Sequence, residues 1–168
     1  MKKKIILGVI GLLVVIQFFR PEKNLTNDRT QDISSKYLVP TELNTILQSA
    51  CKDCHSNKTT YPWYAEIQPF GWWLNHHVTE GKSELNFSSF TKLPIAVQNH
   101  KFEEIKEMVE EKEMPLPSYT WLGLHTEADL TAEDRELIIK WAGSQMDSLK
   151  KQYPPDSLVL KRRAPKPE

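Results

Sequence analysis

Residues 51 to 55 of the 168-residue chain read Cys51-Lys52-Asp53-Cys54-His55, and they include both of its cysteines. Two thiols about one helical turn apart, followed directly by an imidazole, suit four kinds of chemistry. These are a disulfide, a thiol redox couple, a zinc site and covalently attached haem. Each requires a different structure around the motif, so the surrounding sequence must discriminate between them.

The sequence before the motif disfavours the two interpretations that use sulfur alone. Apolar residues recur with helical spacing from Leu43 to Cys54, so we expect both cysteines near the C-terminal end of a helix. The helix dipole disfavours a thiolate there, whereas redox-active CxxC cysteines lie at a helix N-terminus. A disulfide between residues three apart closes a small loop and restrains little of the unfolded chain.

A zinc site needs four ligands, and a single CxxC supplies two. His55 cannot easily share a tetrahedron with its neighbour Cys54. The other ligands would come from the remaining histidines, which contain no H-x₃₋₅-H pair: His76, His77, His100 and His125. A non-haem zinc or disulfide module stays open as an alternative.

Covalent haem uses all three side chains of the motif. The two cysteines can form thioethers with the vinyl groups along one porphyrin edge, and the histidine then turns beneath the ring to ligate iron. Five Trp, five Tyr and six Phe are enough to line a flat apolar ligand. We therefore predict haem c bound through Cys51, Cys54 and His55.

The N-terminus has the pattern of a targeting segment. Lys2, Lys3 and Lys4 precede fifteen uncharged residues, 5–19, and Arg20-Pro21 closes the run. The lysines would stay on the cytoplasmic side while the rest is exported. The run is shorter than the roughly 20 residues of a spanning helix, but no small-x-small cleavage signal follows it. We expect an inner-membrane anchor with a periplasm-facing domain, or alternatively a soluble periplasmic protein after signal cleavage.

Composition divides the chain into four parts. Residues 1–20 form the signal or anchor segment, and the polar, aperiodic residues 21–38 are expected to form a tether. Residues 39–153 form the haem-binding domain, and the proline-rich residues 154–168 a flexible tail. The 22 basic and 22 acidic residues balance, so bulk charge indicates no nucleic-acid partner.

Helical periodicity dominates the expected domain. Helices are predicted over residues 41–54, 72–81 and 94–111, and the last from Thr131 onward. The third carries Phe102, Ile105 and Val109 on one face, and the last carries Leu137, Ile138, Trp141 and Ala142 on one side. Thr41 is a candidate N-cap, and the Thr131 hydroxyl can cap the turn that ends in Asp134. No segment alternates with period two, so the fold class is all-α.

Several segments in consistent order resemble a known family. They are "CKDCHSN", "YPWY", "PFGWWLNHHVTEGKSELNFSSF", "EMPLPSY" and "LHTEADLTAEDRELIIKWA". From Thr41 to Ala142 the chain is similar to the bacterial haem-binding domain family of c-type cytochrome modules. The Met-Pro loop followed by a capped helix also resembles the second half of class I cytochromes c. The resemblance implies a small cytochrome c-like helical domain, although Leu116 stands where many relatives have proline.

Met114 is the predicted sixth iron ligand. Pro115 and Pro117 stiffen its loop and end the preceding helix, so the thioether can be held at a fixed distance over a haem face. The rival is His77, which lies four residues after Trp73 and shares its helix face. His76 would point away, and His125 is expected to fix a loop. Candidates for packing on the porphyrin are Trp63, Trp72, Trp73, Trp121 and Trp141.

The resulting prediction is a membrane-tethered monohaem c-type cytochrome that transfers electrons between redox partner proteins. It is more consistent with a carrier than with an enzyme, and no catalytic residue is assigned. A haem-based sensor with an open sixth position and a peroxidase-like protein are the rival haem functions. The latter would need a distal acid–base pair, for which His77 with Glu80 or Glu84 is the only candidate.

Overall fold

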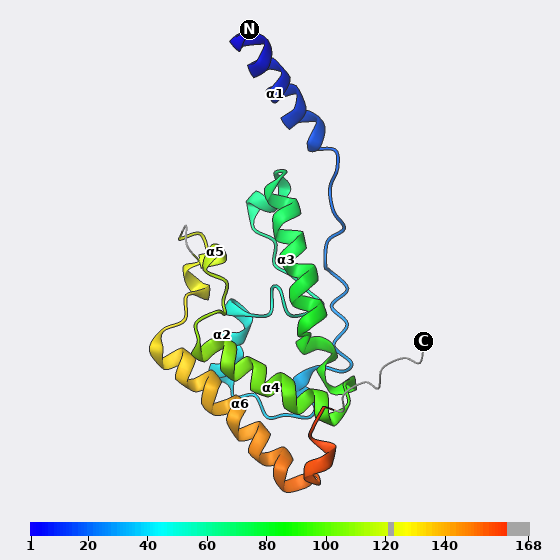
Figure 1. Cartoon of the computed structure of the whole chain (residues 1–168), viewed down its shortest axis with the longest axis vertical. Helices are drawn as coiled ribbons and strands as arrows, with labels where there is room; N and C mark the ends of the chain where they lie inside the picture. Colours follow the sequence, from blue (N-terminus) through cyan, green and yellow to red (C-terminus); the bar gives the residue numbers. More distant parts are fainter. Residues whose placement is uncertain (121–122, 161–168) are drawn as a thin grey trace, which may run out of the picture.

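The computed structural model describes residues 1–120 and 123–160, and all regular structure within these ranges is helical (Figure 1). The predicted all-α class is confirmed. The α-helices are α1 (Lys2–Ile16), α2 (Thr41–Ala50), α3 (Phe70–Glu84), α4 (Ile95–Glu110), α5 (Pro117–Thr120) and α6 (Ala132–Gln152). Short 3₁₀ turns are η1 (Ile33–Ser35), η2 (Trp63–Glu66), η3 (Phe87–Lys92), η4 (Thr126–Ala128) and η5 (Pro155–Ser157).

The main core lies where α4 and α6 pack side by side, with α2 against them (Figure 1). The ring of Phe102 on α4 meets Trp141 on α6 edge to face, with centroids 5.5 Å apart. The apolar faces predicted for these two helices pack in the core. Phe102, Ile105 and Val109 on α4 and Ile138, Trp141 and Ala142 on α6 are buried, and Leu137 is partly buried. Because these residues recur with the 3.6-residue period of a helix, the sequence predicts that they lie on one buried face.

The predicted cap of the last helix is confirmed. The Thr131 hydroxyl accepts a hydrogen bond from the Asp134 amide at 3.1 Å, and the Asp134 carboxylate accepts one from the Thr131 amide at 3.0 Å. This reciprocal pair satisfies amides that the first turn of α6 leaves without intrahelical partners.

The helix before the cysteines is shorter than expected. α2 ends at Ala50, so Cys51 and Cys54 lie beyond it and not within it. Thr41 is the first helical residue, and its side chain makes no capping bond; Pro40 occupies the cap position. The apolar stripe misled the prediction because Cys51 does pack against the core although its backbone has left the helix.

Residues 21–38 do not form the expected tether. Ile33 and Tyr37 are buried in the main core, where Tyr37 packs edge to face on Phe102. The Asn27 amide donates to Asn57 O at 2.9 Å, and the Asn24 side chain donates to Ser56 O at 2.8 Å. These polar bonds follow no hydrophobic period, so the sequence pattern could not reveal them.

The start of the expected tail is also packed, because Leu158 is buried against the core. Residues 161–168 lie outside the described part of the chain.

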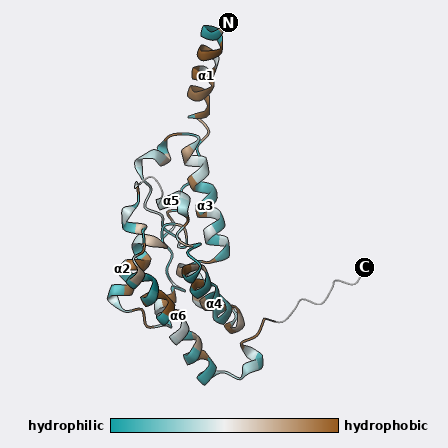
Figure 2. Cartoon of the chain, turned by 60° about the vertical axis from the view of Figure 1, so that its left-hand side comes forward, coloured by the Kyte–Doolittle hydropathy of each residue, from teal (hydrophilic) through white to brown (hydrophobic). Residues whose placement is uncertain are grey.

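α1 differs from the other long helices in having no buried residue. It extends away from the domain, and Figure 2 shows that it is largely hydrophobic. Within residues 1–120 and 123–160, no helix is both long and apolar enough to cross a membrane.

Candidate haem-binding site

The five motif residues form one tight turn directly after α2, here called the CxxCH turn (residues 51–55). The amides of Cys51 and Lys52 both donate to Leu47 O, at 3.0 and 2.9 Å, which ends the helix. The amides of Cys54 and His55 both donate to Cys51 O, at 3.2 and 2.9 Å. The backbone therefore holds the two thiols and the imidazole in a fixed local arrangement.

His55 is held in one orientation and one tautomer. Its Nδ1 lies 3.1 Å from Leu85 O, and because a carbonyl only accepts, Nδ1 carries the proton. The Phe87 amide donates to His55 O at 2.8 Å, which fixes the backbone too. Burial lowers the pKa of His55, with the nearby carbonyls of Leu85 and Gly81 acting in the opposite direction. A neutral ring whose Nδ1–H is engaged leaves the Nε2 lone pair free, as in metal-ligating histidines.

Gly81 allows α3 to approach the CxxCH turn closely. A Cβ at this position would lie 3.1 Å from both Cβ and O of Cys54, and 3.3 Å from Cε1 of His55. These contacts are tighter than ordinary van der Waals distances, so any larger residue would push α3 and the turn apart.

The two cysteines are free thiols that burial makes less acidic. Burial, followed by the neighbouring Cys54, raises the pKa of Cys51 to about 12. Burial, followed by Asp53, raises the pKa of Cys54 to about 11. Redox-active CxxC cysteines have the opposite property, a lowered pKa. The electrostatic environment therefore opposes a thiol redox couple.

Two adjoining cavities open beside the turn, of about 50 and 310 Å³. Both are lined by Ala50, Cys51, His55 and Met114. The larger one continues between apolar side chains of α2, α4 and α6. The larger cavity is at the lower end of the roughly 300–1,000 Å³ range of ligand pockets, and the smaller one lies below it.

Met114 reaches the cavities from a loop that is fixed at both of its backbone groups. Its amide donates to Met108 O at 3.0 Å, and its carbonyl accepts from Arg135 Nη1 at 3.0 Å. The same Arg135 nitrogen also donates to Val109 O at 3.1 Å. The thioether is therefore carried by backbone tied to both α4 and α6.

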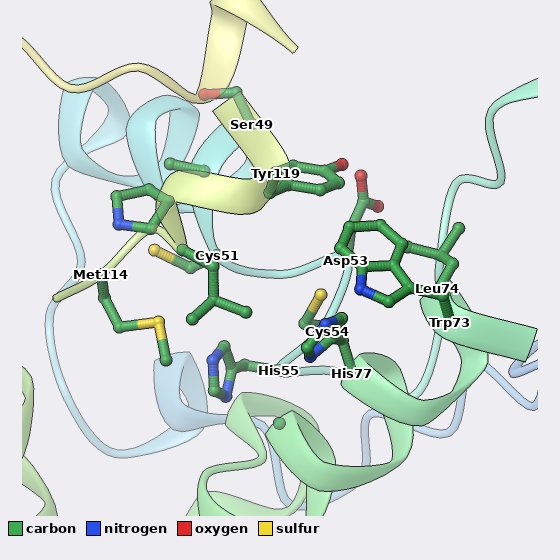
Figure 3. A pocket seen from close by; sticks show the side chains of 14 residues that line it. Ser49, Cys51, Asp53, Cys54, His55, Trp73, Leu74, His77, Met114 and Tyr119 are labelled. Carbon is green, nitrogen blue, oxygen red and sulfur yellow. The ribbon is translucent and has the colours of Figure 1, made fainter. Parts of the chain in front are cut away.

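His77 lines the smaller cavity from α3. Its ring meets Trp73 edge to face, with centroids 4.7 Å apart, and burial followed by the adjacent His76 lowers its pKa. His76 points elsewhere and pairs with Glu80 at 3.2 Å. The prediction that His77 is the inward residue of the pair is confirmed. In Figure 3, Met114 lies on one flank of the cavity and His77 with Trp73 on the other, with the CxxCH turn between them.

His125 fixes a loop, as predicted. Its Nε2 lies 2.6 Å from the Tyr64 hydroxyl, and its ring stacks on Tyr119 with centroids 3.9 Å apart. Tyr119 itself lines the cavity, a role that sequence reasoning missed because α5, with four residues, is too short for a periodic signal. The only sequence signal for this role is the stretch "PLPSY", whose two prolines restrict the backbone that leads to Tyr119.

The tryptophans divide among different roles. Trp73 lines the cavity, Trp141 lies in the main core, and Trp63 and Trp72 are exposed. Trp121 lies outside the described residues. In the part of the chain that the structure describes, no three His, Cys, Asp or Glu side chains gather as a metal-ion site.

The donor set fits haem. Two thiols, an imidazole with a free Nε2, a thioether and a second imidazole all line the smaller cavity. No curated protein and no solved structure matches the chain. A family model described as a haem-binding domain matches residues 11–144, which is most of the chain. The protein therefore belongs to the haem-binding domain family.

Proposed function

We propose that the chain binds haem covalently through Cys51 and Cys54, with His55 as an iron ligand, and that it acts as an electron carrier. The observation that carries this proposal is the hydrogen bond from His55 Nδ1 to Leu85 O, which places the ring proton on Nδ1, while burial favours the neutral ring and so leaves Nε2 free. The neighbouring thiols lie in the same turn, and the family match supports haem as the ligand.

Each part of the site has a distinct task in this proposal. The CxxCH turn presents two sulfurs for thioether bonds and one nitrogen for iron. The apolar walls from α2, α4 and α6 exclude water, which tunes the potential of a bound haem. Bound haem supplies an iron that takes up and releases one electron.

Met114 is the proposed second axial ligand, with His77 as the rival. The fixed backbone of the Met114 loop favours the thioether, because a held loop loses little freedom on ligation. A His/Met pair gives a higher potential than two histidines. Two protein ligands would leave no open position, which favours electron transfer over a sensor.

The peroxidase-like alternative has less support in the geometry. It requires an acid–base pair beside the open face of the haem. Glu80, one of the two carboxylates suggested for this role with His77, pairs with His76 instead. The other, Glu84, lies near Lys101, at 3.9 Å.

We further propose that α1 attaches the protein to the inner membrane and that the domain exchanges electrons with redox partner proteins in the periplasm. The apolar, wholly exposed surface of α1 supports this attachment. A cleaved signal and a soluble periplasmic protein remain the alternative.

The decisive experiment is intact-mass spectrometry of the denatured protein, expressed in a host with cytochrome c maturation. A mass increase of one haem that survives denaturation is expected, together with an absorption spectrum of thioether-bound haem. Haem that dissociates on denaturation would refute covalent attachment but retain haem binding. Loss of zinc, or a mass lower by two hydrogens, would instead identify the zinc or disulfide module.

A further inference from the structure

Five large apolar side chains are exposed at one end of the domain. We call them the aromatic rim, and their exposed fractions are Trp63 71%, Phe70 56%, Ile67 43%, Trp72 39% and Trp73 36%. Single exposed apolar residues are ordinary, but several large ones gathered together mark an interaction surface.

Local geometry gathers the rim residues. The Gly71 amide donates to Ile67 O at 3.0 Å, so the first turn of α3 continues directly from the segment after η2. A Cβ at Gly71 would lie only 2.4 Å from Ala65 O, so the two segments are in close contact. The rim is therefore built from two segments in direct contact: η2 with the residue that follows it, and the first turn of α3.

The base of α1 is attached to this same surface. Gln17 Nε2 donates to Gln68 O at 3.1 Å, and the Gln68 amide donates to Gln17 Oε1 at 2.9 Å. Trp72 Nε1 donates to Phe19 O at 2.6 Å, and Arg20 pairs with Glu66 at 2.6 Å. Figures 1 and 2 both show α1 leaving the molecule beyond this end of α3.

The length of α1 gives the rim a physical role. Its 15 residues rise about 22 Å at roughly 1.5 Å per residue, which is less than the roughly 30 Å hydrocarbon core of a bilayer. A short apolar helix draws its flanking residues to the lipid surface. Tryptophan is enriched at that surface, since its ring is apolar and its N–H is polar.

We propose that the aromatic rim lies in the headgroup region of the bilayer that α1 enters. This inference rests on the proposed attachment through α1. A lipid surface is favoured over a protein partner because the rim is continuous with a helix whose large apolar side chains are exposed from Ile5 to Val15. Trp73 also lines the haem cavity, so docking would bring that cavity next to the membrane.

The test uses the full haem-loaded chain in phosphatidylcholine vesicles containing lipids brominated either near the headgroup or near the chain end. Flotation of the vesicles first reports attachment through α1. Tryptophan quenching by bromine then reports depth, and comparison with Trp63→Phe isolates the signal of Trp63. This conservative change keeps an apolar ring at an exposed position. We expect shallow bromine to quench the Trp63 signal at least twofold and deep bromine to quench it less.

A second pair of variants tests the rim as a surface. Ile67→Gln with Phe70→Gln should reduce the quenching of Trp63, whereas Leu38→Gln with Val159→Gln, exposed apolar positions outside the rim, should leave it unchanged. Flotation without quenching of Trp63 would overturn rim docking while attachment through α1 stands. Absence of flotation would refute both.

Discussion

The CxxCH turn is held more firmly than the two side chains on the flanks of the cavity, Met114 and His77. His55 is fixed by a hydrogen bond from its ring, by one to its carbonyl and by the close approach of Gly81. On the flanks, Met114 is held only through its backbone, and His77 packs edge to face on Trp73 without a hydrogen bond to the turn. Under the proposed function, the turn would determine where iron is bound, whereas the flanks leave open which second ligand it receives, and hence the potential.

The largest effect should come from the turn itself. Replacing Cys51 and Cys54 together with Ala should abolish covalent haem, and His55→Ala should prevent stable maturation because the only nitrogen held in the turn is lost. Haem staining after denaturing electrophoresis measures this. His100→Ala is the matched control and should stain fully, because this imidazole pairs with Glu104 but itself lines neither cavity. A stained double cysteine variant would contradict the covalent proposal.

The next effect separates the haem proposal from a thiol redox couple. In protein made without maturation, the pKa values of about 12 and about 11 mean that almost no thiolate exists at pH 8, since a raised pKa favours the protonated form. Alkylation of Cys54 should be about two orders of magnitude slower than for an ordinary thiol with a pKa of about 8.5. The urea-unfolded chain is the control. Rapid alkylation of the folded protein would indicate an activated cysteine.

Spectroscopy can distinguish the two candidate ligands on the flanks, Met114 and His77. If Met114 ligates iron, the ferric protein should show the weak far-red band of sulfur-to-iron charge transfer. Met114→Ala should remove this band and lower the reduction potential, because a His/Met pair has the higher potential. His77→Ala is the paired variant and should retain the band. Absence of the band in the parent protein, with high-spin iron only in His77→Ala, would assign the ligand to His77.

A smaller effect tests how tightly the turn is packed. Gly81→Ala should destabilise the protein by about 1–3 kcal/mol, because the new methyl group crowds Cys54 and His55. Gly143→Ala in α6 is the control, since a Cβ there meets nothing within 4 Å. That change should stabilise the helix by about 0.5–1 kcal/mol. Urea unfolding measures both, and equal effects would mean that the approach of α3 is not constrained.

The smallest effect concerns the backbone that carries Met114. Arg135→Gln removes the guanidinium that donates to Val109 O and Met114 O, and it should cost about 1–3 kcal/mol at most. If Met114 is the ligand, the far-red band should also weaken or shift. Lys140→Gln, an exposed change on the same helix, should leave the band unaltered. A structural role alone would lower stability without changing the spectrum.

Sequence reasoning succeeded where one residue pattern decides the structure. The spacing of Phe102, Ile105 and Val109 predicted a buried helix face, and Thr131 with Asp134 predicted a cap. It also placed His77, and not His76, on the cavity side. These features depend on residues a few positions apart, so the local sequence contains them.

The remaining features depend on contacts between distant segments. The bond from His55 to Leu85 joins residues thirty positions apart, and the burial of Ile33 and Tyr37 requires α4 to be in place. Polar residues such as Asn24 make hydrogen bonds that hydropathy cannot register. The identity of the sixth ligand stays a prediction for a related reason, since the fold brings both Met114 and His77 to one cavity.

The hydrogen bonds between residues 24–27 and the loop at 56–59 bear on whether haem attachment precedes folding of the domain. They close over the chain just after the CxxCH turn, and in the folded domain both thiols are only partly exposed. Under the proposed attachment, the thioether bonds must form while this loop is still open. Haem attachment then competes with folding, so a variant that folds faster would carry less haem.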